Sequence, residues 1–260
     1  MSKNQYIFLF GTLAIVVGLY FGFDTVPSKL KQIEQTRAIN MESTGVNNLL
    51  KSAFDSLAKD QKSMIEAINL ELDGTGTDTI KRIEKLKALS GTWYEYGFPS
   101  LAGVYAEELA TYSKTEEPWS ITGTTFALCV KNATDEKVRD FCSKRSIKAF
   151  ENAISINPES VQHRINLAIC FVDNPSPDNP MQGILMLREL NEKHPENVSV
   201  MNQLAQLALQ TNQNDKALAR LEVAIKLEPE NKNTICLIAE ALKRAGKTNE
   251  ADAYYKKCIN

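Results

Sequence analysis

The feature of this sequence that most constrains its fold is the stretch between Pro195 and Pro229, which are 34 residues apart. It falls into two halves with small and apolar residues at helical spacing, separated by a turn at Asn212. These residues are Met201, Leu204, Ala205 and Ala208 in the first half and Ala217, Leu221 and Ala224 in the second. Small residues let two antiparallel helices approach closely, so we expect Ala205 and Ala217 at their contact. One such hairpin cannot bury its apolar face alone, which predicts further hairpins stacked against it.

Versions of the same hairpin pattern occur elsewhere along the chain. The first begins near Ile83, has Gly97 in its turn, and places Pro99 in the first turn of its second helix, where a missing N–H is tolerated. The second begins at Trp119, and we expect its turn to be expanded, at about residues 132–139.

The third and fifth hairpins flank the central one. The turn of the third, residues 173–180, holds three prolines; Asn179 fits the N-cap of the next helix and Pro180 its first helical position. The fifth begins near Ile235. Together the hairpins predict an all-α solenoid of about five helix-turn-helix repeats over residues 83–260.

The segment 46–74 precedes the repeats. Apolar residues recur at helical spacing from Val46 to Leu72, with a break near Gln61. The segment is either a helical cap that covers the first repeat or a self-association helix. We expect the cap, because the terminal apolar face of a solenoid must be covered. Residues 73–78, rich in Gly, Thr and Asp, are expected to form a turn rather than a calcium loop.

The N-terminus holds an uncharged, mostly apolar run from Tyr6 to Phe23. Its 18 residues are just long enough to span a hydrocarbon core of about 30 Å. A cleaved signal peptide is the alternative, but no A-x-A-like site follows the run. We therefore expect residues 1–26 to be a short tail and a retained transmembrane anchor, followed by a polar tether at 27–45.

The charges that flank this run leave its orientation open. Lys3 and the terminal amine are balanced by Lys29, Lys31 and Arg37. Short tails before a single anchor usually leave the large domain outside the cytoplasm. We expect a single-pass protein of the bacterial inner membrane with its soluble domain in the periplasm.

The composition is that of a globular chain, 43% hydrophobic and 24% charged. A formal net charge of −2 argues against a protein that binds nucleic acid through a basic surface. The five cysteines are odd in number and lack CxxC spacing, so they are expected to be small buried residues rather than a disulfide framework or a zinc site. A disulfide between Cys129 and Cys142 remains an alternative if the domain lies outside the cytoplasm.

The repeats over residues 83–260 resemble tetratricopeptide repeats (TPR). The whole layout of tail, anchor, tether and repeats is similar to membrane-anchored TPR proteins of Bacteroidota, most of all in the stretch 178–191. The resemblance implies a scaffold that binds segments of other proteins in a concave groove. One version of this groove holds a C-terminal carboxylate with a clamp of Lys, Asn and Arg. The corresponding positions here lack that clamp: they are Ile165 and Ile169, Asn202 and Gln206, Cys236 and Glu240.

In this architecture the first helix of each repeat lines the groove, which identifies candidate partner-binding residues. They lie on one face of the fourth repeat, where they are amides, and of the fifth, where they are charged. The six candidates are Asn202, Gln206, Gln210, Glu240, Lys243 and Arg244. Amide side chains carry both donors and acceptors and can pair with the backbone of an extended peptide.

Motifs of enzyme chemistry are absent from the sequence. His163 and His194 have no metal-spaced partner, and HExxH, GxSxG and the P-loop do not occur. We expect no enzyme, no cofactor and no metal. Two functions remain: a membrane-anchored scaffold for a protein client or subunit of a cell-envelope complex, or an oligomerising anchor without a specific peptide ligand. The polar groove side chains favour the scaffold; a homo-oligomer is compatible with both.

Overall fold

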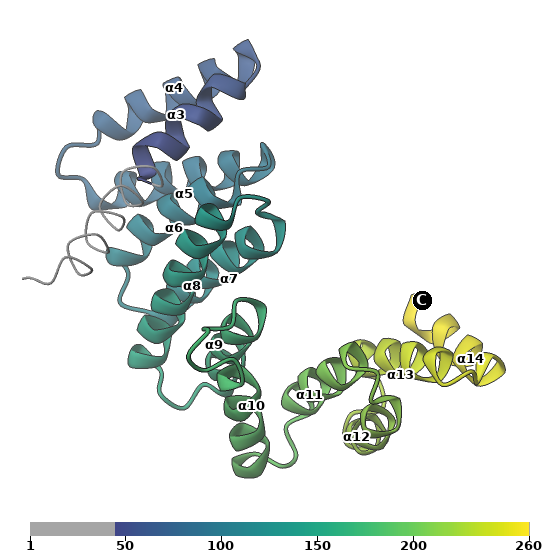
Figure 1. Cartoon of the computed structure of the whole chain (residues 1–260). Helices are drawn as coiled ribbons and strands as arrows, with labels where there is room; N and C mark the ends of the chain where they lie inside the picture. The colour runs from purple at the N-terminus through teal and green to yellow at the C-terminus, as the bar shows by residue number, and fades with distance from the viewer. Residues whose placement is uncertain (1–44, 260) are drawn as a thin grey trace, which may run out of the picture. The chain divides into compact units, whose positions relative to one another are not determined.

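The computed structural model describes residues 45–259, and every regular element in this range is a helix (Figure 1). The packing described below lies within one compact unit, the residues from Leu50 onward. The twelve helices of the described range are α3 (Val46–Ser56), α4 (Lys59–Asp73), α5 (Thr79–Glu95), α6 (Pro99–Thr111), α7 (Glu116–Asn132), α8 (Glu136–Ile156), α9 (Val161–Asp173), α10 (Gln182–Lys193), α11 (Val198–Gln210), α12 (Asn214–Leu227), α13 (Lys232–Arg244) and α14 (Thr248–Ile259).

Helices α5 to α14 form five antiparallel hairpins that stack in chain order, as a TPR-like solenoid requires. The junctions between the later repeats have the same helix-capping pattern. A Pro–Glu pair ends one repeat, and the next residue caps the following helix: Ser160, Asn197 and Asn231 each accept a hydrogen bond from the backbone N–H three positions on. The prolines that define the repeat period therefore stand two residues before the helix N-caps.

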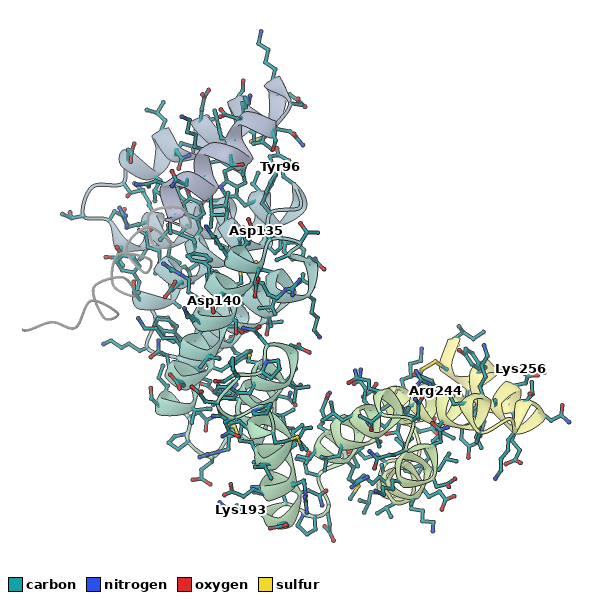
Figure 2. All side chains as sticks on the ribbon, in the orientation of Figure 1. Tyr96, Asp135, Asp140, Lys193, Arg244 and Lys256 are labelled. Carbon is teal, nitrogen blue, oxygen red and sulfur yellow. A yellow bond between two sulfur atoms is a disulfide. The ribbon has the colours of Figure 1, made fainter. Side chains whose placement is uncertain are left out.

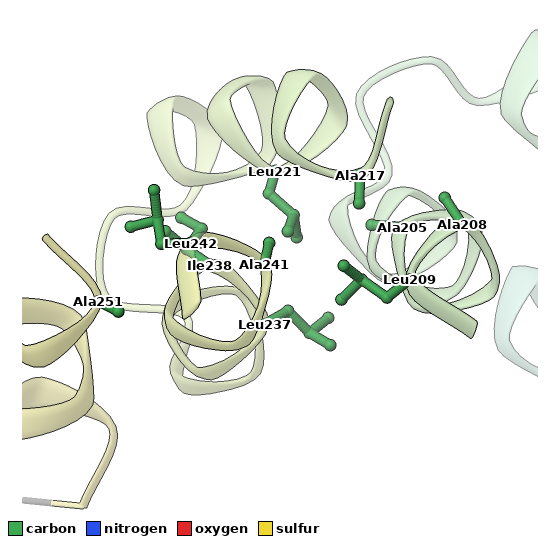
Figure 3. Packing of buried hydrophobic residues seen from close by; sticks show 10 residues of the cluster. All are labelled: Ala205, Ala208, Leu209, Ala217, Leu221, Leu237, Ile238, Ala241, Leu242 and Ala251. Atoms are coloured by element: carbon green, nitrogen blue, oxygen red, sulfur yellow. The ribbon is translucent and has the colours of Figure 1, made fainter. Parts of the chain in front are cut away.

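Small residues bring the paired helices together. Ala205 on α11 and Ala217 on α12 are both fully buried, which confirms the contact that their spacing predicts. Figure 3 shows them with Leu221 in the cluster that α11 to α14 share. Asn212, with φ of 58°, makes the turn of this hairpin and adopts the left-handed conformation that asparagine tolerates.

Three details of the helix boundaries differ from the sequence-based expectations. The second repeat has a turn of only three residues, 133–135, because the extra residues extend α7 and α8 instead. Helix α10 begins at Gln182 after Met181, so Asn179 and Pro180 belong to the loop, where Asn179 bridges to Ser176. The break between α3 and α4 lies at residues 57–58 rather than near Gln61.

The segment 46–74 is thus a pair of helices, and α4 packs against α5. Its role as a cap remains a prediction. The expected anchor at Tyr6–Phe23 and the tether at 27–45 lie outside the described residues, apart from Gly45. No helix in the part that the structure describes has the length and apolar character needed to cross a membrane.

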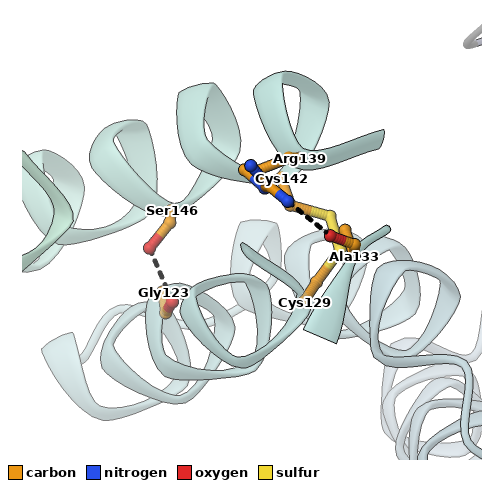
Figure 4. The surroundings of a disulfide bond; sticks show 6 residues. All are labelled: Gly123, Cys129, Ala133, Arg139, Cys142 and Ser146. Carbon is orange, nitrogen blue, oxygen red and sulfur yellow. Dashed lines mark hydrogen bonds between the residues drawn. A yellow bond between two sulfur atoms is a disulfide. The ribbon is translucent and has the colours of Figure 1, made fainter. Parts of the chain in front are cut away.

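Two disulfides correct the expectation that the cysteines are simply buried residues. Cys129 and Cys142 join α7 to α8 with a Cα–Cα distance of 6.0 Å (Figure 4), and Cys236 and Cys258 join α13 to α14 with a Cα–Cα distance of 5.0 Å. The first pair was the alternative that the sequence left open; the second was not foreseen. Each bond closes a helical hairpin, because antiparallel helices bring residues that are distant in sequence side by side.

Candidate functional site

A small cavity opens between the first helices of the third and fourth repeats. Its volume is about 140 Å³. The cavity is lined mainly by α9 and α11, as expected if first helices form the binding wall. The lining residues are Lys131 from α7, Ile169, Val172 and Asp173 from α9, Leu187 from α10, and Gln203, Gln206, Leu207 and Gln210 from α11. We refer to this cavity as the groove cavity.

Three glutamines form the α11 side of the groove cavity. Gln206 and Gln210, two of the predicted residues, are exposed and lie one helical turn apart. Gln203, which was not predicted, precedes Gln206 by three residues on the same helix and lines the same cavity. Its position one turn before Gln206 was the signal available in the sequence. Ile169 and Val172 stand opposite and give the cavity an apolar wall.

A charged pair sits beside these amides. Lys131 Nζ lies 3.4 Å from a carboxylate oxygen of Asp173, and both residues line the groove cavity. Lys131 is at the end of α7 and Asp173 at the end of α9, so the pair links two repeats at the exposed rim. An exposed pair of this kind contributes little to stability, which leaves both charges able to exchange partners.

Asn202 takes a different position from the one predicted. It is 2% exposed, and its amide nitrogen donates to the Thr234 hydroxyl at 2.9 Å. Thr234 lies in the first turn of α13, so Asn202 links the fourth repeat to the fifth. The amide is buried at this junction and does not line the groove cavity.

The charged candidates of the fifth repeat also have other contacts. Arg244 (Figure 2) pairs with Glu240 at 2.6 Å and donates to the Leu209 carbonyl oxygen at 2.8 Å, at the end of α11. Lys243 lies 5.9 Å from the ring centroid of Tyr255 on α14. None of these three candidates lines the groove cavity. The structure therefore brings Gln206 and Gln210 together, and it adds Gln203, Lys131 and Asp173.

Cys170, on α9, is the cysteine outside the two disulfides. It is buried beside the Ser146 hydroxyl at 3.1 Å, and Ser146 donates to the Gly123 carbonyl oxygen (Figure 4). Burial raises the pKa of the Cys170 thiol to about 11, so the thiol stays protonated and unreactive at neutral pH. Within residues 45–259, no three His, Cys, Asp or Glu side chains are grouped to hold a metal ion.

Comparison with solved structures connects this geometry to a known fold. The structure of TTC0263, a thermophilic TPR protein of Thermus thermophilus, matches with a TM-score of 0.50 and 16% sequence identity, over 75% of this chain and 98% of that one. The chain has a tetratricopeptide-like helical repeat fold. At this identity the likeness establishes the fold of the repeat protein alone.

Three other matches cover less of this chain. A family model described as a bacterial transcriptional activator domain matches residues 174–260, less than half of the chain. A MamA crystal structure is 15% identical over 68% of this chain and 90% of that one, with a TM-score of 0.41. The MamA structure from Desulfovibrio magneticus RS-1 is 15% identical over 68% of this chain and 93% of that one, with a TM-score of 0.42. Comparison with curated protein sequences gives no match.

Proposed function

We propose that this TPR-like protein is a scaffold that binds an extended segment of a partner protein in the groove cavity. The observation that carries the proposal is the row of Gln203, Gln206 and Gln210 on α11, opposite the apolar residues Ile169 and Val172. Amides can donate to and accept from the backbone of a bound peptide, and the apolar wall can take one of its side chains. Lys131 and Asp173, at the rim, would then favour peptide side chains of complementary charge.

The proposal includes a cellular setting. We propose that residues 6–23 anchor the chain in a bacterial inner membrane and that the repeats work in the periplasm. Two disulfides support an oxidising compartment, because such bonds persist there and are rare in the cytosol. Acid-quenched labelling of thiols in intact cells checks this: we expect one labelled cysteine per denatured chain, Cys170. Five labelled cysteines would place the repeats in a reducing compartment.

The groove is tested with the double variant Gln206→Ala and Gln210→Ala in the full-length protein. We expect recovery of the partner from solubilised membranes to fall about tenfold, which corresponds to about 1.4 kcal/mol. Both side chains are exposed, so the melting temperature should not change. Quantitative mass spectrometry of co-purified proteins, with thermal unfolding measured in parallel, provides both readouts.

Two controls make this test specific. Glu222→Ala with Lys226→Ala truncates two exposed side chains of α12 without changing net charge. This variant should leave recovery of the partner unchanged. Asn202→Ala should instead lower stability by about 1–3 kcal/mol, because it removes the buried hydrogen bonding between Asn202 and Thr234. Equal recovery of the partner by the glutamine variant and by the wild type would contradict binding in the groove cavity.

A further inference from the structure

A second, larger cavity lies at the same junction of the third and fourth repeats, bounded by the second helices. Its volume is about 390 Å³. The lining residues are Asn191 from α10, Met201 from α11, and Lys216, Ala219, Arg220 and Val223 from α12. We call it the α10–α12 furrow. It shares no residue with the groove cavity.

The α10–α12 furrow combines an apolar floor with positive charge. Met201 is 6% exposed at its base, whereas Val223 is 47% exposed on its wall. Lys216 and Arg220 supply two cations, and no carboxylate lines the cavity. Their contacts are with neutral groups: Lys216 donates to the Gln213 amide oxygen at 2.7 Å, and Arg220 to the Lys216 carbonyl oxygen at 3.3 Å. Both cations therefore lack a carboxylate partner in the described part of the chain.

The wall that carries these cations is held in place by the opposite face of α12. Ala217, Leu221 and Ala224 are fully buried, and Figure 3 shows Ala217 and Leu221 directed into the cluster with α11 and α13. Lys216, Arg220 and Val223, spaced four and three residues apart, lie on the outer face. The furrow is thus a preformed surface with a positive rim.

Helix α4 carries the complementary surface. Its buried residues, Ile65 and Leu72, are on one side, while Leu70 is 75% exposed. Glu66 and Asp73 stand one helical turn before and after Leu70, both exposed and without an ion pair among residues 45–259. The result is an exposed leucine between two carboxylates.

We propose that copies of this chain associate head to tail, with α4 of one copy in the α10–α12 furrow of the next. Leu70 enters the recess over Met201, and Glu66 and Asp73 face Lys216 and Arg220. The two surfaces match in two respects: an exposed apolar side chain meets an open apolar recess, and carboxylates meet cations. Because the two faces differ, a pair of bound copies still has one free α4 face and one free furrow. Assembly can therefore extend beyond a dimer.

A charge swap in the full-length protein tests this interface. One variant carries Lys216→Glu and Arg220→Glu, and the other carries Glu66→Lys and Asp73→Lys. Two differently tagged copies are co-expressed, solubilised in neutral detergent and purified through one tag. We expect wild-type copies to co-purify. When a variant is co-expressed with itself, the amount that co-purifies should fall at least about tenfold, because like charges then oppose one another.

The decisive pairing joins the two variants. The furrow of the first variant is acidic and the α4 face of the second is basic, while the first keeps the wild-type α4 face and the second the wild-type furrow. Both contacts between unlike copies are therefore complementary in charge, so recovery to about half of the wild-type signal or more is expected. Loss of self-association in both variants without this rescue would overturn the proposed contact. So would wild-type copies that fail to co-purify, or variants that associate as wild type does.

Three further measurements separate this interface from other causes. Circular dichroism should show wild-type melting for both variants, because Glu66, Asp73 and Lys216 are exposed and the half-buried Arg220 lines the furrow rather than the core. Lys114→Glu with Lys148→Glu, two exposed lysines outside the furrow, makes the same charge change and should leave association intact. Gln206→Ala with Gln210→Ala should also associate normally, so failure of the groove proposal and failure of this one are distinguishable. Self-association lost equally in the lysine control would indicate a net-charge effect and contradict the interface.

Discussion

Gly183→Val is expected to lower the free energy of unfolding by about 3 kcal/mol, the upper end of the usual cost of overpacking. A Cβ atom at Gly183 would lie 2.4 Å from the Ala168 carbonyl oxygen, 2.7 Å from Val172 Cγ2 and 2.8 Å from the Val172 backbone nitrogen. Two of these atoms belong to the α9 backbone and cannot rotate away. The substitution must therefore push α10 away from α9 and open the hairpin of the third repeat.

Urea unfolding of the full-length protein, followed by circular dichroism, measures this loss. Gly91→Ala is the matched control: Gly91 is exposed within α5, and its Cβ would meet nothing within 4 Å. That substitution should stabilise the protein by up to about 1 kcal/mol through helix propensity alone. Because repeats couple mainly to their neighbours, hydrogen exchange in the Gly183 variant should rise first in α9 to α11. Wild-type unfolding of Gly183→Val would contradict the close approach of α9 and α10.

Removal of the Cys129–Cys142 disulfide, by Cys129→Ser with Cys142→Ser, is expected to cost about 3 kcal/mol. The two cysteines are 13 residues apart, and the chain-entropy model gives this value for a loop of that length. Both residues are nearly fully buried, so the new hydroxyls add a desolvation cost. Thermal unfolding of the full-length variant should show the change.

The Cys236–Cys258 disulfide offers an internal comparison. Its residues are half-buried, and it ties α14 to α13, the helix on which α14 packs. Cys236→Ser with Cys258→Ser should therefore raise hydrogen exchange in α14 while α7 and α8 keep wild-type protection. The Cys129 variant should show the reverse pattern. Identical exchange profiles for the two variants would mean that the disulfides do not act within their own hairpins.

Much of the fold was accessible from the sequence because it depends on local spacing. The interval between Pro195 and Pro229 set the repeat length, and Ala205 and Ala217 identified the faces that meet. Loop lengths were less accessible. The insertion around residues 132–139 could lengthen a loop or a helix, and the sequence pattern did not distinguish the two; in the structure α8 extends over 21 residues.

The binding site was less accessible, because it depends on how successive repeats stack. Periodicity placed Asn202 one turn from Gln206 on the same helix, which made both candidates. Only the approach of α13 shows that Thr234 reaches Asn202 and removes it from the surface. Similarly, Lys131 and Asp173 meet across two repeats, and no short-range spacing in the sequence indicates that contact.

Both disulfides begin and end within a single repeat, 13 and 22 residues apart. Each hairpin therefore contains both sulfur atoms of its own crosslink. During synthesis, the hairpin with Cys129 and Cys142 can form its bond before the later repeats have emerged, and the two pairs need not compete for one another. The order of crosslinking then follows the direction of the chain, so oxidative maturation of this solenoid should be vectorial and should need little disulfide isomerisation.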